Sequence, residues 1–159
     1  MEIHYRPAQE NDISTMADLI FSHLPLLQSD PKILPAQDFF DSCSATTQRQ
    51  HFHAGTHTSW VAVHDDQVIG FITILEPKHL YHLFIDAQFQ RRGIAKQLWQ
   101  LAWRHVQAHP EFSTWDAITV NSSITAVKVY QQFGFELLSE RKDVHGLAFY
   151  AMAKKLAHS

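Results

Sequence analysis

The pattern of apolar and polar positions along the chain predicts strands in its middle and helices after them. Residues 59–75 (SWVAVHDDQVIGFITIL) contain two β-rich runs that flank Asp65 and Asp66, and this arrangement predicts an antiparallel hairpin. The next run, residues 79–86 (HLYHLFID), predicts another strand. From Ile94 onward the apolar residues recur at helical spacing. A second helical pattern, residues 126–133, ends at Gly134, which suits the position after a helix.

The N-terminal third predicts a strand and two helices. Residues 3–8 (IHYRPA) read as a short strand, and Asp12 is placed to cap a helix that begins at Ile13. Residues 36–50 (AQDFFDSCSATTQRQ) predict a second helix. Residues 51–57 (HFHAGTH) hold three histidines, but Gly55 argues against a helix that would align them as metal ligands. We therefore expect a solvated loop there, and no metal site.

Three further runs toward the C-terminus complete the predicted sheet. Residues 115–123 (WDAITVNSS) predict a strand that ends in small polar residues, and residues 134–140 and 146–156 predict two last strands. The order of elements predicts an α+β fold, in which a mixed, largely antiparallel central sheet carries helices on both faces. A length of 159 residues is that of a single domain spanning 1–159.

Composition narrows the functional classes. The net charge of −3 and the pI near 6.4 argue against a nucleic-acid partner. No apolar run is long enough to span a membrane, and no secretory signal is recognisable at the start. Cys43 is the single cysteine, which fits a reducing compartment, so we expect a cytoplasmic protein.

Positive charge gathers where the long helix is predicted to begin. Arg91, Arg92 and Lys96 surround Gly93, and the first backbone N–H groups of a helix lack intrahelical acceptors. Cations at that end are unfavourable for the helix dipole unless an anion is bound, and a diphosphate fits the site. The run lacks the spaced glycines of a nucleotide-binding P-loop and of a dinucleotide fold.

Two motifs in this order resemble the GNAT superfamily of N-acetyltransferases. Residues 83–99 (LFIDAQFQRRGIAKQLW) are similar to its coenzyme A loop, in which a Gln/Arg-x-x-Gly-x-Gly/Ala pattern follows a strand. Residues 120–136 (VNSSITAVKVYQQFGFE) are similar to its second signature, with Ala126, Tyr130, Gly134 and Phe135 in register. The resemblance covers roughly residues 60–156 and implies the three-layer GNAT fold.

The resemblance also implies an activity and a set of binding residues. It implies transfer of the acetyl group of acetyl-CoA to a primary amine by direct attack, with no metal. The coenzyme-binding positions that it implies are Leu83, Phe84, Ile85, Gln90, Arg91, Arg92, Gly93, Ile94, Ala95 and Lys96. Ser123 stands where an asparagine is common, so the further polar contact falls to either Asn121 or Ser123.

Catalytic roles follow from the same resemblance and from acid–base chemistry. Tyr130 is the candidate general acid, because a phenol is protonated at neutral pH. The backbone amide of Ile85 is the expected donor to the developing oxyanion. For the general base we consider Glu76, His82 and also His79, and the sequence does not choose among them.

The acceptor amine carries no legible motif, so a small molecule and a protein amine both remain open. The alternative function is a non-catalytic acyl-CoA-binding module that senses or regulates. Trp99 and Trp103 lie one helical turn apart, and an exposed aromatic pair there predicts a homodimer contact.

Overall fold

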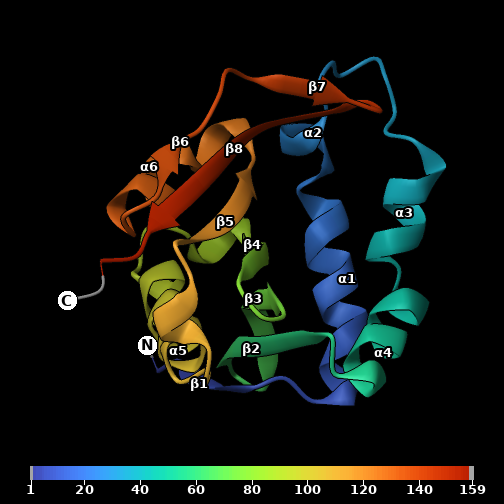
Figure 1. Ribbon diagram of the computed structural model, residues 1–159. Helices are drawn as coiled ribbons and strands as arrows, with labels where there is room; N and C mark the ends of the chain where they lie inside the picture. Colours follow the sequence, from blue (N-terminus) through green and yellow to red (C-terminus); the bar gives the residue numbers. More distant parts are fainter. Residues whose placement is uncertain (1, 158–159) are drawn as a thin grey trace.

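The computed structural model describes residues 2–157, which form one eight-stranded sheet between two layers of helices (Figure 1). The strand order is β1-β2-β3-β4-β5-β8-β6, and β7 pairs with β8. Within this sheet β4 and β5 run parallel, whereas the other paired strands are antiparallel. The predicted fold class, a mixed and largely antiparallel sheet flanked by helices, is confirmed.

The strands are β1 (His4–Pro7), β2 (His57–His64), β3 (Gln67–Leu75), β4 (His79–Ile85), β5 (Ala117–Ser122), β6 (Glu136–Leu137), β7 (Lys142–Val144) and β8 (Leu147–Lys155). The α-helices are α1 (Ile13–Ser22), α2 (Leu24–Leu27), α3 (Gln37–Cys43), α4 (Ala45–Ala54), α5 (Ile94–Gln107) and α6 (Val127–Gln132). Short 3-10 turns are η1 (Glu10–Asp12), η2 (Ala87–Phe89), η3 (Phe112–Thr114) and η4 (Ile124–Ala126).

Each face of the sheet has its own apolar core. Helices α1 to α4 lie on one side of the sheet in Figure 1, and α5 and α6 lie on the other. Because side chains alternate along a strand, Phe71 of β3 packs toward α1 while Ile72 packs toward α5. Ile94, Leu98 and Ala102 of the helix predicted from Ile94 onward are buried in the larger core.

The structure corrects the predicted N-terminal elements. The second predicted helix is two helices, α3 and α4, because Ser44 has an extended backbone and its side chain caps α4 by accepting from the Thr47 N–H. The expected solvated loop at 51–57 is wrong in part. His51 and His53 lie on α4, Gly55 ends that helix with a φ of 73°, and His57 begins β2. The glycine taken as evidence against a helix is the residue that terminates it.

Segments from opposite ends of the chain are joined at one end of the molecule. The Ser29 N–H donates to the Gly146 carbonyl and the Ala36 N–H donates to the His145 carbonyl, both at 2.9 Å. Gln28 forms a β-bridge with Leu147 beside them. A Cβ on Gly146 would lie 2.8 Å from the Leu34 carbonyl oxygen, so the turn of the β7–β8 hairpin is tightly packed against residues 28–36. We call this contact the terminal clasp.

Asp12 precedes α1 as predicted, but its side chain makes no capping bond to that helix. Its carboxylate accepts from both Arg6 Nη1 (2.7 Å) and Arg6 Nη2 (3.0 Å), and also from the Gln9 N–H. Burial alone would raise the pKa of Asp12, but the bonds from Arg6 and Gln9 outweigh it and hold the pKa below its ordinary value. The carboxylate therefore ties β1 to the start of α1.

We expect Asp12→Asn to lower the free energy of unfolding by about 2 kcal/mol, because the amide leaves the Arg6 guanidinium without its charged partner. Urea unfolding at neutral pH, followed by circular dichroism, measures the change. Asp18→Asn, on the exposed side of α1, is the matched control and should change the free energy by less than about 0.5 kcal/mol. Equal stability of the two variants would contradict this role for Asp12.

Candidate functional site

The parallel strands β4 and β5 are paired at two positions, His79 opposite Thr119 and Leu80 opposite Val120. Beyond them, residues 81–85 of β4 and 121–122 of β5 have no pairing with each other. We call these unpaired inner edges the fork. Its closed end lies at Leu80 and Val120, and its open end lies at Ile85. An extended ligand chain can hydrogen-bond to such an edge as an added strand would.

The direction of the β4 amides decides which of them face the fork. The Asp86 N–H donates to the Ile69 carbonyl of β3 at 2.7 Å. Since backbone groups alternate along a strand, the N–H groups of Leu83 and Ile85 point into the fork, and that of Phe84 points toward β3. Of the three predicted strand residues, Leu83 and Ile85 therefore offer donors to a ligand.

A β-bulge lies near the closed end. Thr73 of β3 is opposite His82, but the next residue, Ile74, is opposite Leu80, so Tyr81 has no partner on β3. A bulge locally increases strand twist and bends the strand that carries it. The bulge therefore supplies a physical reason for β4 to leave β5 at this point.

The loop between β4 and α5 carries the residues of the predicted anion site, 90–96, which we call the cradle. Arg91 and Gly93 both have positive φ, 64° and 79°, so the backbone turns sharply before the helix starts. The first intrahelical bond runs from the Gln97 N–H to the Gly93 carbonyl, and no side chain caps α5. The N–H groups of Ile94, Ala95 and Lys96 are thus without helical acceptors. These donors and the helix dipole favour an anion here.

The charged side chains of the cradle are exposed. Arg91, Arg92 and Lys96 all lie at the surface, and the Arg92 guanidinium stacks over the Phe89 ring at 5.5 Å. Exposed guanidinium and ammonium groups of this kind can donate to phosphate oxygens.

Gln90 connects the cradle to the rest of the site. Its Nε2 donates to the carbonyl of Ile85, at the open end of the fork, over 3.3 Å. The same nitrogen lies 3.5 Å from Nε2 of His23, at the end of α1. The Gln90 amide thus lies between the fork and the helices of the α1 face.

Asn121 and Ser123 both follow the closed end of the fork on β5. The side chain of Asn121 is exposed and shares a face with Thr119, because Val120 and Ser122 are buried on the other face. Ser123 is half-buried and precedes η4, while the neighbouring Ser122 hydroxyl donates to the Ser123 carbonyl. The choice between Asn121 and Ser123 stays open.

Tyr130 lies on α6, which follows β5 after one short turn, and its side chain is 5% exposed. Its ring packs edge-on against Phe133 and Phe135 in the core of the α5 face. Within residues 2–157 the hydroxyl has no hydrogen-bond partner. Burial raises the pKa of Tyr130, so the phenol stays protonated and can act as a proton donor.

Glu76 does not lie in the fork, contrary to our expectation that it is near the reacting groups. It follows β3 and faces α5, where its Oε2 accepts from His105 Nε2 at 2.9 Å. His105 in turn packs on Trp60. Glu76 directly follows the predicted hairpin, as the sequence indicates, but the sequence does not show which face of the sheet the carboxylate occupies.

His82 faces the α1 side, opposite to its neighbour Leu83. It lines a pocket together with His51, His57 and Tyr81, and the His51 and His57 rings stack at 3.8 Å. We call these four side chains the imidazole cluster. The cavity volume is about 30 Å³, which is room for one or two water molecules. Burial, reinforced by the neighbouring imidazoles, lowers the pKa of His82 to about 3.

The aromatic pair on α5 is not the exposed surface that we expected. Trp99 is 6% exposed, and its ring stacks on Phe133 at 5.3 Å and on Trp103 at 5.5 Å. Lys154 covers Trp103 from β8 at 5.1 Å. The observation on which the homodimer was predicted is therefore removed, because Trp99 belongs to the core.

Two features of the site were not found from the sequence. The first is a hydrogen bond between His79 Nδ1 and Thr119 Oγ1, 2.7 Å long, across the closed end of the fork. The second is the imidazole cluster, whose members come from α4, β2 and β4. The alternation of polar Thr119 and Asn121 with apolar Val120 was the single local hint of the His79–Thr119 bond. No local pattern signals the imidazole cluster.

A metal-binding cluster was not predicted, and residues 2–157 contain no group of three or more histidine, cysteine, aspartate or glutamate side chains suited to hold a metal ion. Among the helices of the same residues, none combines the length and apolar character needed to cross a membrane.

Sequence comparison identifies this arrangement with a known domain. Residues 25–156 match the family model described as an acetyltransferase (GNAT) domain. An uncharacterized N-acetyltransferase of Escherichia coli K12, YafP, is 30% identical over 83 residues. That match covers 52% of this chain and 49% of YafP, so the chain aligns with about half the length of that relative.

Structural comparison gives the same fold. A GCN5-related N-acetyltransferase from Rhodopseudomonas palustris superposes with a TM-score of 0.73 at 17% identity, over 98% of this chain and 97% of the other. The PaiA N-acetyltransferase from Thermoplasma acidophilum, solved in complex with coenzyme A, gives a TM-score of 0.72 at 16% identity, over 98% and 100%.

Proposed function

The chain belongs to the GNAT acetyltransferase family, and from this membership we propose that it transfers the acetyl group of acetyl-CoA to a primary amine. The observation that carries the proposal is a set of unpaired donors. The uncapped N–H groups at the start of α5 adjoin the open end of the fork, and the fork continues as an unpaired strand edge. The cradle and the fork together match a ligand that joins a diphosphate to an extended amide-containing arm.

The residues present fit the coenzyme at each end of the site. The N–H groups of Ile94, Ala95 and Lys96 would hold the diphosphate, with Arg91 and Arg92 neutralising its charge. The N–H groups of Leu83 and Ile85 would bind the arm along the fork. Either Asn121 or Ser123 would add a polar contact from β5.

Acetyl-CoA supplies a thioester whose carbonyl carbon the amine attacks and whose sulfur leaves. In place of the Ile85 amide that we expected from the resemblance, we propose the Leu83 amide as the oxyanion donor, because Leu83 lies two residues nearer to the closed end. The Ile85 amide is then assigned to the arm. Tyr130 would give its proton to the departing sulfur, because its raised pKa keeps the hydroxyl protonated.

The proposal predicts that acetyl-CoA binds and that a carboxylate in the cradle weakens the binding. We expect Gly93→Glu to lower the affinity about 20-fold, since the new charge opposes the diphosphate at the start of α5. Isothermal titration of both proteins with acetyl-CoA measures it. No binding to the wild-type protein would overturn the proposed function.

Gly55→Glu is a closely matched control. Gly55 has a φ of 73°, close to the 79° of Gly93, and a Cβ added at either position would meet no atom within 4 Å. The two variants therefore share the same backbone strain, but Gly55 lies at the end of α4, away from the cradle. Affinity that falls equally in both variants would show a general effect of strain.

A sensor that binds acyl-CoA without turnover is the alternative function. A screen of primary amines with the wild-type protein, read as thiol release from acetyl-CoA, separates the two functions. Release that depends on the amine supports the transferase, and binding without release supports the sensor. The same screen identifies the acceptor amine.

We also propose a cytoplasmic location. The single cysteine, Cys43, is buried and free, which suits a reducing compartment.

A further inference from the structure

The site contains an imidazole that the proposed acid and binding residues leave without a role. We propose that His79 is the group that accepts the proton from the attacking amine. This inference rests on the proposed acetyl transfer. It follows from the position of His79 at the closed end of the fork, from the face of the sheet that it occupies, and from its hydrogen bonding.

The position of His79 at the closed end of the fork supports this role. Residues 81–85 of the fork span about 16 Å at the usual rise of a strand, and the cradle lies at the Ile85 end, where Gln90 bonds to the Ile85 carbonyl. An arm that enters from the cradle along this edge must stop where β4 and β5 become paired. Its acyl end therefore comes to rest near Leu80 and Val120, beside His79.

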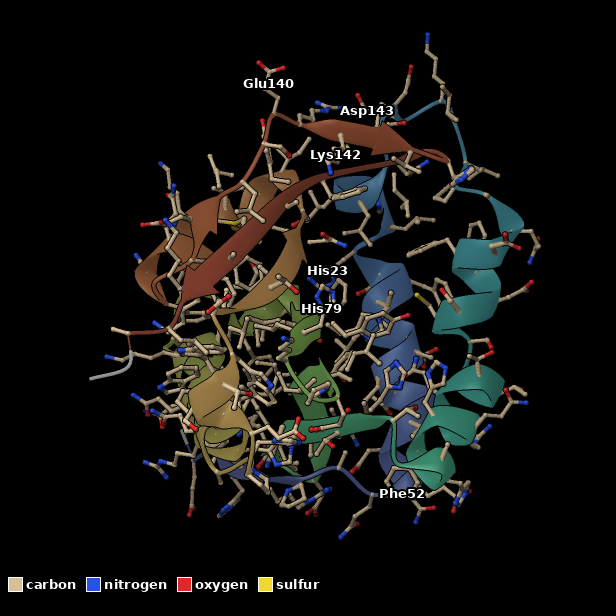
Figure 2. All side chains as sticks on the ribbon, viewed as in Figure 1. His23, Phe52, His79, Glu140, Lys142 and Asp143 are labelled. Carbon is tan, nitrogen blue, oxygen red and sulfur yellow. The ribbon has the colours of Figure 1, made fainter. Side chains whose placement is uncertain are left out.

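The face of the sheet that His79 occupies also supports this role. Leu80 and Val120 are buried in the core of the α5 face, so His79 and Thr119, their chain neighbours, point to the opposite face. Figure 2 shows His79 near the centre of the molecule, between the sheet and α1. Tyr130 belongs to the α5 face. The proton acceptor and the proton donor thus lie on opposite sides of the fork, so the attacking amine and the departing sulfur can each reach a different group.

The hydrogen bonding and protonation state of His79 suit a proton acceptor. Its Nδ1 is held by Thr119 Oγ1, and its Nε2 has no hydrogen-bond partner within residues 2–157. Its ring is half-buried, and this burial lowers its pKa, so the imidazole is neutral at physiological pH. In the tautomer whose Nδ1–H donates to Thr119 Oγ1, Nε2 carries the lone pair that can accept a proton.

The titratable groups around His79 do not compete for this role. On its own strand these are Tyr81 and His82, and β5 contributes the uncharged Thr119. Lys78 directs its ammonium over the Trp115 ring at 5.5 Å. No carboxylate among the described residues forms an ion pair with His79.

The structure separates His79 from the other two candidate bases. Glu76 is bonded to His105 on the α5 face, which is the side of the proton donor. His82 belongs to the imidazole cluster, and its pKa is lowered to about 3. A group with so low a pKa binds protons too weakly to assist the reaction at neutral pH.

The step balances in atoms and charge. The amine nitrogen forms the new bond to the acyl carbon, and the proton that it loses passes to His79 Nε2. The carbon–sulfur bond breaks, and the sulfur takes the proton of the Tyr130 hydroxyl. His79 then releases its proton to water and Tyr130 regains one, so the net products are the N-acetyl amine and the free thiol.

The test uses His79→Gln, which keeps a polar side chain of similar size. We expect kcat/KM for an accepted amine to fall about 50-fold near neutral pH, within the range for loss of a general base. The loss should shrink toward alkaline pH, because there hydroxide can accept the proton in place of His79. The wild-type acid limb, below about pH 6.5, should disappear. The affinity for acetyl-CoA, measured by isothermal titration, should stay within about twofold.

A second readout does not depend on turnover. The His79 imidazole resonances, assigned by their absence in His79→Gln, should shift when coenzyme A is added to the wild-type protein. For the kinetic test the control variant is His4→Gln, because His4 is exposed on β1. The kcat/KM of this variant should match that of the wild type.

The outcomes distinguish two failures. If wild-type turnover is normal, an unchanged kcat/KM in His79→Gln, or an acid limb that persists, overturns the role of His79 and leaves the proposed function standing. If the wild-type protein acetylates no amine, the proposed function fails and this inference fails with it.

Discussion

We expect Tyr130→Phe to lower the turnover number with an accepted amine by about 10³-fold, a value inside the usual range for loss of a general acid. The ring stays, so its contacts with Phe133 and Phe135 persist and the helix keeps its place. What is lost is the hydroxyl proton that burial keeps in place at neutral pH. Steady-state thiol release measures the fall, and KM for acetyl-CoA should change little.

Tyr5→Phe is the matched control for this variant. Tyr5 lies on the edge strand β1, packs against the same core, and also has its pKa raised by burial. Its loss of a hydroxyl should leave turnover within about twofold. Turnover of Tyr130→Phe at the level of Tyr5→Phe would assign Tyr130 to the core alone.

Acidification from about pH 7.5 to about pH 4.5 should lower the free energy of unfolding by about 3 kcal/mol, allowing for solvent screening of partly exposed rings. Burial and the neighbouring imidazoles lower the pKa of His57 to about 4 and that of His82 to about 3. In the unfolded chain a histidine titrates near 6.5. Below that pH the unfolded chain binds protons that the folded chain does not, so stability is complete above about 6.5 and falls toward the folded pKa values.

Urea unfolding over this pH range measures the loss. His82→Phe should recover about half of it, because the aromatic ring keeps the contacts with Phe71 and Phe84 but no longer titrates. His53→Gln is the control, since His53 lies exposed beside Glu10. If the free energy of unfolding falls with acidification as steeply in His82→Phe as in the wild type, the prediction is contradicted.

The pairing of Asp12 with Arg6 should survive at the lower pH, because the pKa of Asp12 is held below its ordinary value.

Much of the fold was predictable because its signals are local. The hairpin at 59–75, the strand at 79–85 and the helix that begins at Ile94 follow from periodicity within each segment. The cradle was predictable for the same reason, since Gly93 and the arginines are adjacent in sequence.

The missing parts depend on which segments meet in three dimensions. Glu76 is next to β4 in the chain, yet its partner, His105, lies 29 residues further on. The burial of Trp99 depends on Phe133, which a different helix brings. The His79–Thr119 bond exists only because the parallel pairing sets its register. Local patterns carry no information about any of these contacts.

The terminal clasp sets an order on how the chain becomes structured during its synthesis. Residues 28–36 leave the ribosome long before His145 and Gly146, yet the backbone N–H groups of Ser29 and Ala36 find their acceptors only in that late segment. Until β8 is made, the region around α2 and α3 lacks these partners, so the N-terminal layer is completed last although it is translated first. A nascent chain stalled before residue 145 should therefore be cut by proteases within residues 28–36, and the finished protein should resist cleavage there.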